Sequence, residues 1–241
     1  MKCPKCQIEH TKVLRFCNGC GTKLEAEPQE NYLVSVNKAK VFFFFLLGYI
    51  GLLHLANFRD FPIDPFLADG VLAVIIIVFL AIDFTELKSV VIPKINDLRT
   101  LGVLIISMII LAYLVHIFSG YLNHDLFDVE NGNYYENYSN TSSPLLLCII
   151  STAVFPAIFE ELAFRGILFS ELLKIMPIRP TIIITSFLFT ILHFSFISLL
   201  WIFPLGFLFG YLRHKYNNII YGVISHFIYN SSVVLIEYFG L

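Results

Sequence analysis

The chain has 241 residues, of which 57% are hydrophobic and only 14% are charged. A soluble domain usually carries about 25% charged residues, so the composition excludes an ordinary soluble protein and favours a polytopic membrane protein. The formal net charge of −2 gives no basic field, so no nucleic-acid partner is expected.

The head of the chain, residues 1–24, carries a pattern typical of a metal site. It reads C-x2-C-x10-C-x2-C, with the cysteines at Cys3, Cys6, Cys17 and Cys20. Two such pairs can present four thiolates tetrahedrally to zinc. Two disulfides are the alternative, which a reducing cytosol disfavours. Four cysteine ligands leave no open position, so we expect a structural zinc ribbon, with His10 at its surface and with the capacity to bind a protein partner.

Residues 25–39 are polar and are expected to form a linker, and nothing before residue 40 resembles a cleavable signal. Apolar blocks then follow at about 41–58, 67–84, 100–122, 144–169, 181–200, 201–213 and 218–240. Most can cross about 30 Å of hydrocarbon at about 1.5 Å per residue. The sequence therefore predicts an all-α bundle of about seven transmembrane helices over residues 40–241. Six or eight spans stay open, since the block at 201–213 is short.

Basic residues indicate the orientation of these spans. If the N-terminus is cytosolic, Arg59 is the one basic residue in the outer loops, and the loop 123–143 has four acids and no Lys or Arg. The cytosolic segments then hold Lys38, Lys40, Lys88, Lys94, Arg99, Lys174, Arg179, Arg213 and Lys215. We therefore expect a multi-pass protein of the cell membrane with a cytosolic N-terminus and an extracytosolic C-terminus.

The block at 144–169 contains two adjacent acids, Glu160 and Glu161, followed by Arg165. Ionisable groups at membrane depth are costly and indicate function. On an α-helix, Glu161 and Arg165 are i and i+4 in the favourable order for an ion pair. Glu160 points about 100° away from Glu161 and has no local partner. It is therefore the candidate general acid or base.

Three later blocks contribute further polar or small residues. His193 follows Phe189 by one helical turn, and His226 and Asn230 are i and i+4 on one helix face. Between them, Gly206 and Gly210 form a small-xxx-small face for close helix contact. The limits of each span are estimated to within a few residues. Shifts of that size can place the acids, the histidines and the asparagine at one depth, in the cytosolic half of the membrane. A water-filled cavity open to the cytosol is the expected site.

The three patterns E-E-x-x-F-R (Glu160–Arg165), F-x-x-x-H (Phe189–His193) and H-x-x-x-N (His226–Asn230) resemble the motifs of the CPBP family. This family comprises CAAX prenyl proteases and bacteriocin-processing membrane enzymes, also called Abi proteins. The resemblance covers about residues 144–241, in the same order and spacing, and leaves the zinc ribbon as an appended module.

The resemblance implies an intramembrane endopeptidase acting on membrane-associated, prenylated or other peptide substrates. It implies that Glu160 with His193 activates a water and that His226 and Asn230 donate to the oxyanion. Glu161 and Arg165 would orient Glu160.

Two alternatives remain. The family is also described as metalloproteases, and Glu160, His193 and His226 could hold a catalytic zinc. We favour metal-free glutamate catalysis, because an Asn beside the second His suits an oxyanion donor better. The other alternative is a non-enzymatic membrane protein, such as a bacteriocin immunity or scaffold factor or a proton-coupled transporter.

Overall fold

The computed structural model describes residues 2–9, 16–17, 19–24, 29–59, 61, 63–123 and 133–240. His10, residues 25–28 of the expected linker and residues 124–132 of the acidic loop lie outside these ranges. The regular elements of the described chain are helical, and the cysteine-bearing head adds two isolated antiparallel bridges. The expected all-α class is confirmed.

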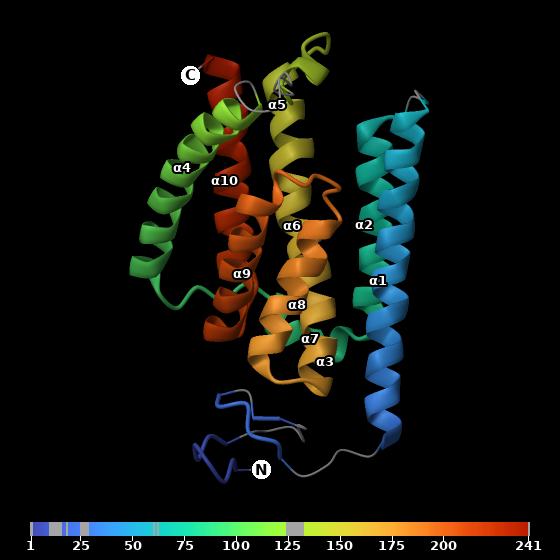
Figure 1. The fold of residues 1–241 in the computed structure, drawn as a ribbon, viewed down its shortest axis with the longest axis vertical. Coiled ribbons are helices and arrows are strands. Elements are labelled where there is room, and N and C mark those ends of the chain that lie inside the picture. The colour runs from blue at the N-terminus through green and yellow to red at the C-terminus, as the bar shows by residue number, and fades with distance from the viewer. Residues whose placement is uncertain are drawn as a thin grey trace. The chain divides into compact units, whose positions relative to one another are not determined.

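Figure 1 shows the helices in order along the chain. They are α1 (Gln29–Phe58), α2 (Pro65–Ile82), α3 (Phe84–Val91), α4 (Leu98–Tyr121), η2 (Glu136–Tyr138), α5 (Pro144–Ile149), η3 (Ile150–Val154), α6 (Phe155–Glu161), η4 (Leu162–Leu168), α7 (Phe169–Ile175), α8 (Ile178–Ile191), α9 (Leu199–Tyr216) and α10 (Ile220–Phe239). Helix α1 begins at Gln29, so most of the segment expected to be a linker is helical.

Helix starts follow local capping signals. Asp64 caps α2 by accepting a hydrogen bond from the amide of Leu67, and Pro65 occupies the first turn, where no N–H is needed. Asp97 caps α4 in the same way through the amide of Thr100. Apolar runs between such caps can satisfy their backbone groups internally, as hydrocarbon requires.

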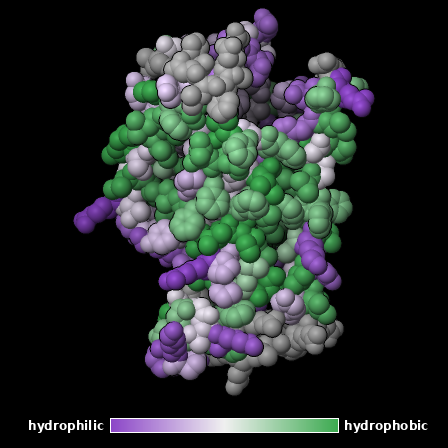
Figure 2. Space-filling view, viewed as in Figure 1, coloured by the Kyte–Doolittle hydropathy of each residue, from purple (hydrophilic) through white to green (hydrophobic). Residues whose placement is uncertain are grey.

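Within the described residues, five helical segments are long and apolar enough to cross a membrane, and the chain is a multi-pass membrane protein. They are Tyr32–Phe58, Pro65–Ile82, Leu98–Tyr121, Pro144–Ile175 and Ile220–Phe239. Over α1 and α2 the visible surface is mainly hydrophobic (Figure 2). The predicted count of seven is not confirmed, because the blocks at 181–200 and 201–213 form α8, which has only 14 residues, and α9, which does not qualify as a span.

The chain divides into two compact units. Unit 1 comprises residues 1–92 and 162–219, and unit 2 comprises residues 93–161 and 220–241. In unit 1, α8 packs along α9 and α1 packs against α7. A small core there is formed by Phe169, Ile178 and Ile182, with Leu173 against it.

In unit 2, α10 is the central helix. It packs along α4 and against α5, η3 and α6. The hydroxyl of Tyr221 on α10 accepts hydrogen bonds from the amides of Asn96 and Asp97, at 3.0 and 2.7 Å. The start of α4 is thereby held against the start of α10.

Candidate active site

The two acids lie on a continuous helical segment whose geometry changes along its length. The segment Pro144–Ile175 runs as α5, η3, α6, η4 and α7, and η3 and η4 are π-helical. Glu160 and Glu161 are the last residues of α6, so they directly precede the π-helical η4. Such π turns are rare and occur frequently at functional sites.

Within unit 2, one imidazole lies between the two carboxylates. The Nδ1 atom of His226 on α10 is 3.5 Å from Oε1 of Glu161. Its Nε2 atom is 3.9 Å from Oε2 of Glu160. Glu161 is fully buried and His226 is 6% exposed, whereas the side chain of Glu160 keeps 26% exposure. The structure thus brings three of the sequence-predicted site residues together, with a different carboxylate at each ring nitrogen.

The chemistry of this group follows from the two distances. Each ring nitrogen of His226 faces a different carboxylate, so both acids help to set the orientation of the ring. The 3.9 Å between Nε2 and Glu160 is too long for a direct hydrogen bond, but a water molecule can bridge such a gap. Of the two carboxylates, that of Glu160 is therefore the one with access to water.

Asn230 lies one turn after His226 and connects α10 to η3. Its Nδ2 donates a hydrogen bond to the carbonyl of Thr152 at 2.9 Å. Since the amide nitrogen carries two hydrogens, one N–H remains after this bond. The bond to Thr152 is a contact that helical spacing could not indicate, because it joins residues 78 positions apart.

Arg165 belongs to unit 1, where its guanidinium is fully buried. Its Nη2 donates to the carbonyl of Gly206 at 3.0 Å, and the guanidinium carbon lies 4.4 Å from the ring centre of Phe189 and 5.4 Å from that of Phe209. Cation–π contacts of this kind gain strength when desolvated. A side chain added at Gly206 would meet Arg165 and Phe189 at 3.2–3.3 Å, so the expected close-contact role of this glycine is confirmed.

His193, also in unit 1, lies just beyond the end of α8. Its Nδ1 is 2.9 Å from the carbonyl of Phe189, one of the last carbonyls of that helix. A carbonyl can only accept, so Nδ1 carries the hydrogen in this contact and Nε2 of the neutral ring presents a lone pair. A lone pair at Nε2 can take a proton from water or bind a metal.

The four cysteines of the head come together in unit 1. Their sulfur atoms all lie within 4.8 Å of one another, with Cys3 to Cys20 at 3.6 Å and Cys6 to Cys17 at 3.4 Å. A tetrahedral zinc site with Zn–S bonds of about 2.3 Å has sulfur–sulfur distances of about 3.8 Å. The four thiols therefore fit a zinc ion closely, and in the described part of the chain they are the one cluster with metal-binding geometry.

The two cysteine pairs have the same backbone. In the first, the amide of Gln7 donates to the carbonyl of Cys3, and in the second, the amide of Gly21 donates to that of Cys17. Both donors have positive φ, at 61° for Gln7 and 72° for Gly21. Glycine adopts this conformation without strain, which accounts for Gly21 at this position.

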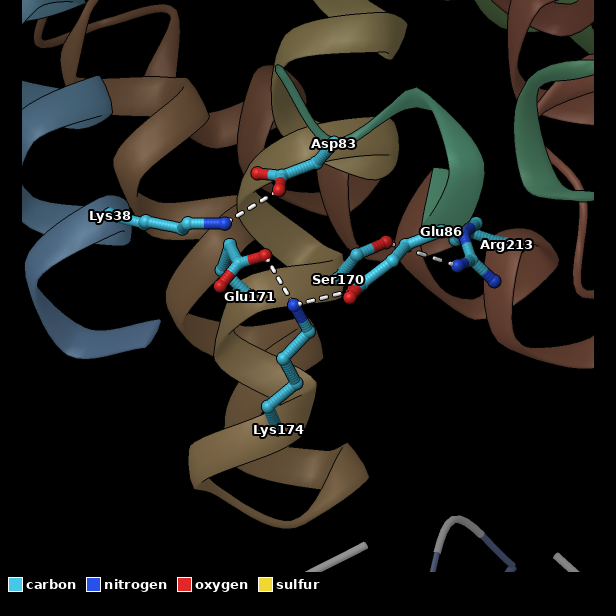
Figure 3. Close-up of polar contacts among 7 residues, drawn as sticks. All are labelled: Lys38, Asp83, Glu86, Ser170, Glu171, Lys174 and Arg213. Carbon is cyan, nitrogen blue, oxygen red and sulfur yellow. Dashed lines mark hydrogen bonds and ion pairs between the residues drawn. The ribbon is translucent and has the colours of Figure 1, made fainter. Parts of the chain in front are cut away.

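One polar cluster was not found from the sequence. It lies in unit 1 and contains Lys38, Asp83, Glu86, Glu171 and Lys174 (Figure 3). The only local signal is Glu171 three residues before Lys174 on one helix face. The remaining pairings join segments that are far apart in the sequence.

One segment of the chain matches the model of a known protein family. Residues 142–232 match the family model Rce1-like, described as type II CAAX prenyl endopeptidase Rce1-like. No curated protein and no solved structure gives a significant match. The matched segment contains every one of the three motifs and ends before the C-terminus of α10.

Proposed function

Since residues 142–232 belong to the CPBP family of CAAX intramembrane proteases, we propose that this chain is an intramembrane endopeptidase that hydrolyses a peptide bond of a membrane-associated substrate. The observation that supports the proposal most is the pairing of His226 with both Glu160 and Glu161 within unit 2. A carboxylate, an imidazole and limited exposure to water are the requirements for activating a water molecule at membrane depth.

Glu160 is the general base of this proposal. Its side chain is the more exposed of the two acids, so it can reach a water molecule. It would take a proton from that water as the oxygen attacks the substrate carbonyl, and would return the proton to the leaving amine. The family resemblance adds His193, whose Nε2 lone pair suits the same task.

His226 and Asn230 are the oxyanion donors of this proposal. With Glu161 beside Nδ1, the protonated ring can donate from Nε2 to the oxygen of the tetrahedral intermediate. The second N–H of Asn230, one turn later, can donate to the same oxygen, because Thr152 occupies only one of the two. Loss of one such donor typically lowers the rate about 10²–10³-fold.

Glu161 and Arg165 are positioning residues. Glu161 holds His226, and Arg165 fixes the helix through Gly206 and the aromatic rings of Phe189 and Phe209. The predicted ion pair between Glu161 and Arg165 remains a prediction. It assumed α-helical spacing, whereas Arg165 lies in the π-helical turn η4.

We further propose that catalysis proceeds without a metal. The metal alternative would use Glu160, His193 and His226 as ligands, but Asn230, one turn after His226, suits an oxyanion donor better than a metal ligand. The zinc of this chain is then the structural ion of the cysteine ribbon. The family description also makes a prenylated C-terminal peptide the first substrate to test.

Cleavage of a peptide pool by the purified protein tests the proposal. The pool contains each peptide with and without a prenyl group on its C-terminal cysteine, and each reaction is run with and without a chelator. Glu160→Gln should abolish cleavage, and Glu136→Gln, which changes an exposed acid of η2, should leave it intact. Loss of cleavage with chelator in the wild type would favour the metal alternative. If Glu160→Gln cleaved as well as the wild type, the acids would have a structural or ion-conducting role in a non-enzymatic protein.

A further inference from the structure

Unit 1 contains a cavity that plays no part in the proposed hydrolysis. It measures about 330 Å³ and lies between α1, α2, η4 and α7. Phe42 and Ile167, which are 1% and 4% exposed, belong to its buried wall. Val34, Val41 and Ile82 are about half exposed or more, so they form its open rim. This size lies at the lower end of the range for small-molecule pockets, so the cavity can hold one head group or a similar fragment.

One end of the cavity is charged. Lys38 of α1 pairs with Asp83, just after α2, at 2.5 Å, and Glu171 of α7 lies beside them (Figure 3). Lys38 is in the first turns of the span Tyr32–Phe58, Asp83 follows the last residue of α2, and Glu171 is in the last turns of the span Pro144–Ile175. All three therefore lie near the ends of candidate membrane spans, which corresponds to the depth of the head groups of a bilayer.

The carboxylate of Glu171 is incompletely satisfied. Oε1 binds Lys174 at 2.6 Å, whereas Oε2 is buried and has no hydrogen-bond partner, although Glu171 is only 3% exposed. Figure 3 shows this second oxygen turned away from Lys174. A buried acceptor without a donor is costly, so the cavity lacks one hydrogen-bond donor at this atom.

Ion pairs connect the acids of this cluster, since Lys174 contacts both Glu171 and Glu86 and Lys38 contacts Asp83. None of these contacts reaches Oε2 of Glu171. A ligand that carries a cation with N–H donors would supply the donor that this carboxylate oxygen lacks, and charge-assisted hydrogen bonds of this kind are the strong ones. A primary ammonium group has these properties.

We propose that the cavity binds the head group of a phosphatidylethanolamine lipid, with its ammonium on Oε2 of Glu171 and its acyl chains leaving past Val34 and Ile82. The ammonium donates to Glu171, and Lys38 provides a cation next to the lipid phosphate. Phosphatidylcholine has the same charge and similar chains but no N–H, so it cannot supply the donor. The open apolar rim at head-group depth favours a lipid over a soluble amine.

A series of lipids with decreasing N–H donors tests this proposal. The full-length protein is reconstituted in bilayers of phosphatidylcholine that contain equal small amounts of phosphatidylethanolamine, its N-methyl form or its N,N-dimethyl form. Bound lipid is then counted by native mass spectrometry after extraction. Retention should fall along the series, and phosphatidylethanolamine should be enriched about tenfold over phosphatidylcholine, as one charge-assisted hydrogen bond implies.

Two variants localise the effect. Glu171→Gln should remove the enrichment, whereas Glu86→Gln should retain it. Both substitutions remove a negative charge beside Lys174, but Glu86 does not line the cavity. Equal retention of all four lipids by the wild type would overturn the proposal even if Glu171→Gln failed to fold. So would an equal loss of enrichment in both variants, because it would indicate attraction by charge alone.

Discussion

At the scale of single residues, His226 decides how the two acids differ. From helical spacing, Glu161 was expected to pair with Arg165 and Glu160 to stay alone. In the structure, His226 contacts both carboxylates, and their difference lies in burial, since Glu161 is fully buried and the Glu160 side chain is 26% exposed. A buried carboxylate must keep its partners, whereas an exposed one can exchange them for water.

Substitution of the two acids should therefore have unequal effects on stability. Glu161→Gln leaves His226 without its buried counter-charge, and breaking a buried pair typically costs about 3–5 kcal/mol. We expect a clearly lower melting temperature and lower turnover. Glu160→Gln should keep the melting temperature close to that of the wild type while abolishing turnover. Thermal unfolding in detergent checks both, and equal melting temperatures would contradict the assignment of Glu161 as a positioning residue.

Thr22 should influence the lowest pH at which the cysteine site keeps its metal ion. Its hydroxyl lies 3.1 Å from Sγ of Cys20, and this hydrogen bond, with one from the Thr22 backbone, lowers the pKa of the Cys20 thiol to about 6. The lowered pKa favours the thiolate, whose stabilising contribution is complete above the ordinary thiol pKa and is lost as the pH falls through about 6.

Because zinc binds thiolates, Thr22→Ala should release zinc at a higher pH than the wild type on acidification. Thr22→Ser keeps the hydroxyl and serves as the matched control. Zinc bound per chain is measured after dialysis at a series of pH values. Identical release curves for the wild type and Thr22→Ala would contradict the role of this hydroxyl.

At the scale of elements, close approach between α8 and α9 depends on glycine. A Cβ on Gly206 would lie 3.2 Å from the ring of Phe189 and 3.3 Å from both Nη2 of Arg165 and the backbone of Ser186. The ring is confined because it also contacts Arg165, so it cannot move without disturbing the cation–π contact. Gly70 in α2 has nothing within 4 Å of the same position.

Gly206→Ala should consequently lower the free energy of unfolding by about 1–3 kcal/mol, as is typical of overpacking, and the melting temperature should fall with it. Gly70→Ala should be neutral or slightly stabilising, since alanine favours helix by up to about 1 kcal/mol. The two variants are compared by thermal unfolding under the same conditions. A neutral Gly206→Ala would mean that α8 and α9 can separate without cost.

At the scale of the whole molecule, the distribution of basic residues predicts the orientation in the membrane. The five qualifying helices establish a multi-pass protein, but the topology also depends on whether α8 and α9 cross the bilayer. With 14 residues, α8 extends about 21 Å at 1.5 Å per residue, less than the hydrocarbon thickness of about 30 Å. The positive-inside pattern still predicts an inside N-terminus and an outside C-terminus.

Labelling of introduced cysteines in intact cells measures this orientation. A membrane-impermeant thiol reagent should modify Asn140→Cys, in the acidic loop, and should not modify Lys215→Cys, at the end of α9. Both positions are exposed. Labelling of Lys215→Cys alone would reverse the predicted orientation, and the proposed cytosolic opening of the site with it.

The sequence by itself determined the features that depend on composition and short spacing. Apolar blocks predict membrane helices, because backbone groups in hydrocarbon must be satisfied within a segment. The cysteine pairs predict the cluster of four thiols, which the structure confirms, because each turn is built from residues close in sequence. The three motifs predict the protease family from short spacings as well, and residues 142–232, which contain them, match the Rce1-like family model.

Only the tertiary structure decided which of these residues meet. Glu161 and His226 are 65 positions apart in the sequence, and Thr152 and Asn230 are 78 positions apart, so no local spacing indicates such contacts. The π-helical turns η3 and η4 also change the angle between successive side chains, so α-helical spacing misplaces residues near them. The lipid cavity beside Glu171 is likewise a tertiary feature, because its charged end joins α1, the end of α2 and α7. Oε2 of Glu171 lacks a hydrogen-bond donor only because the folded structure buries this atom away from water.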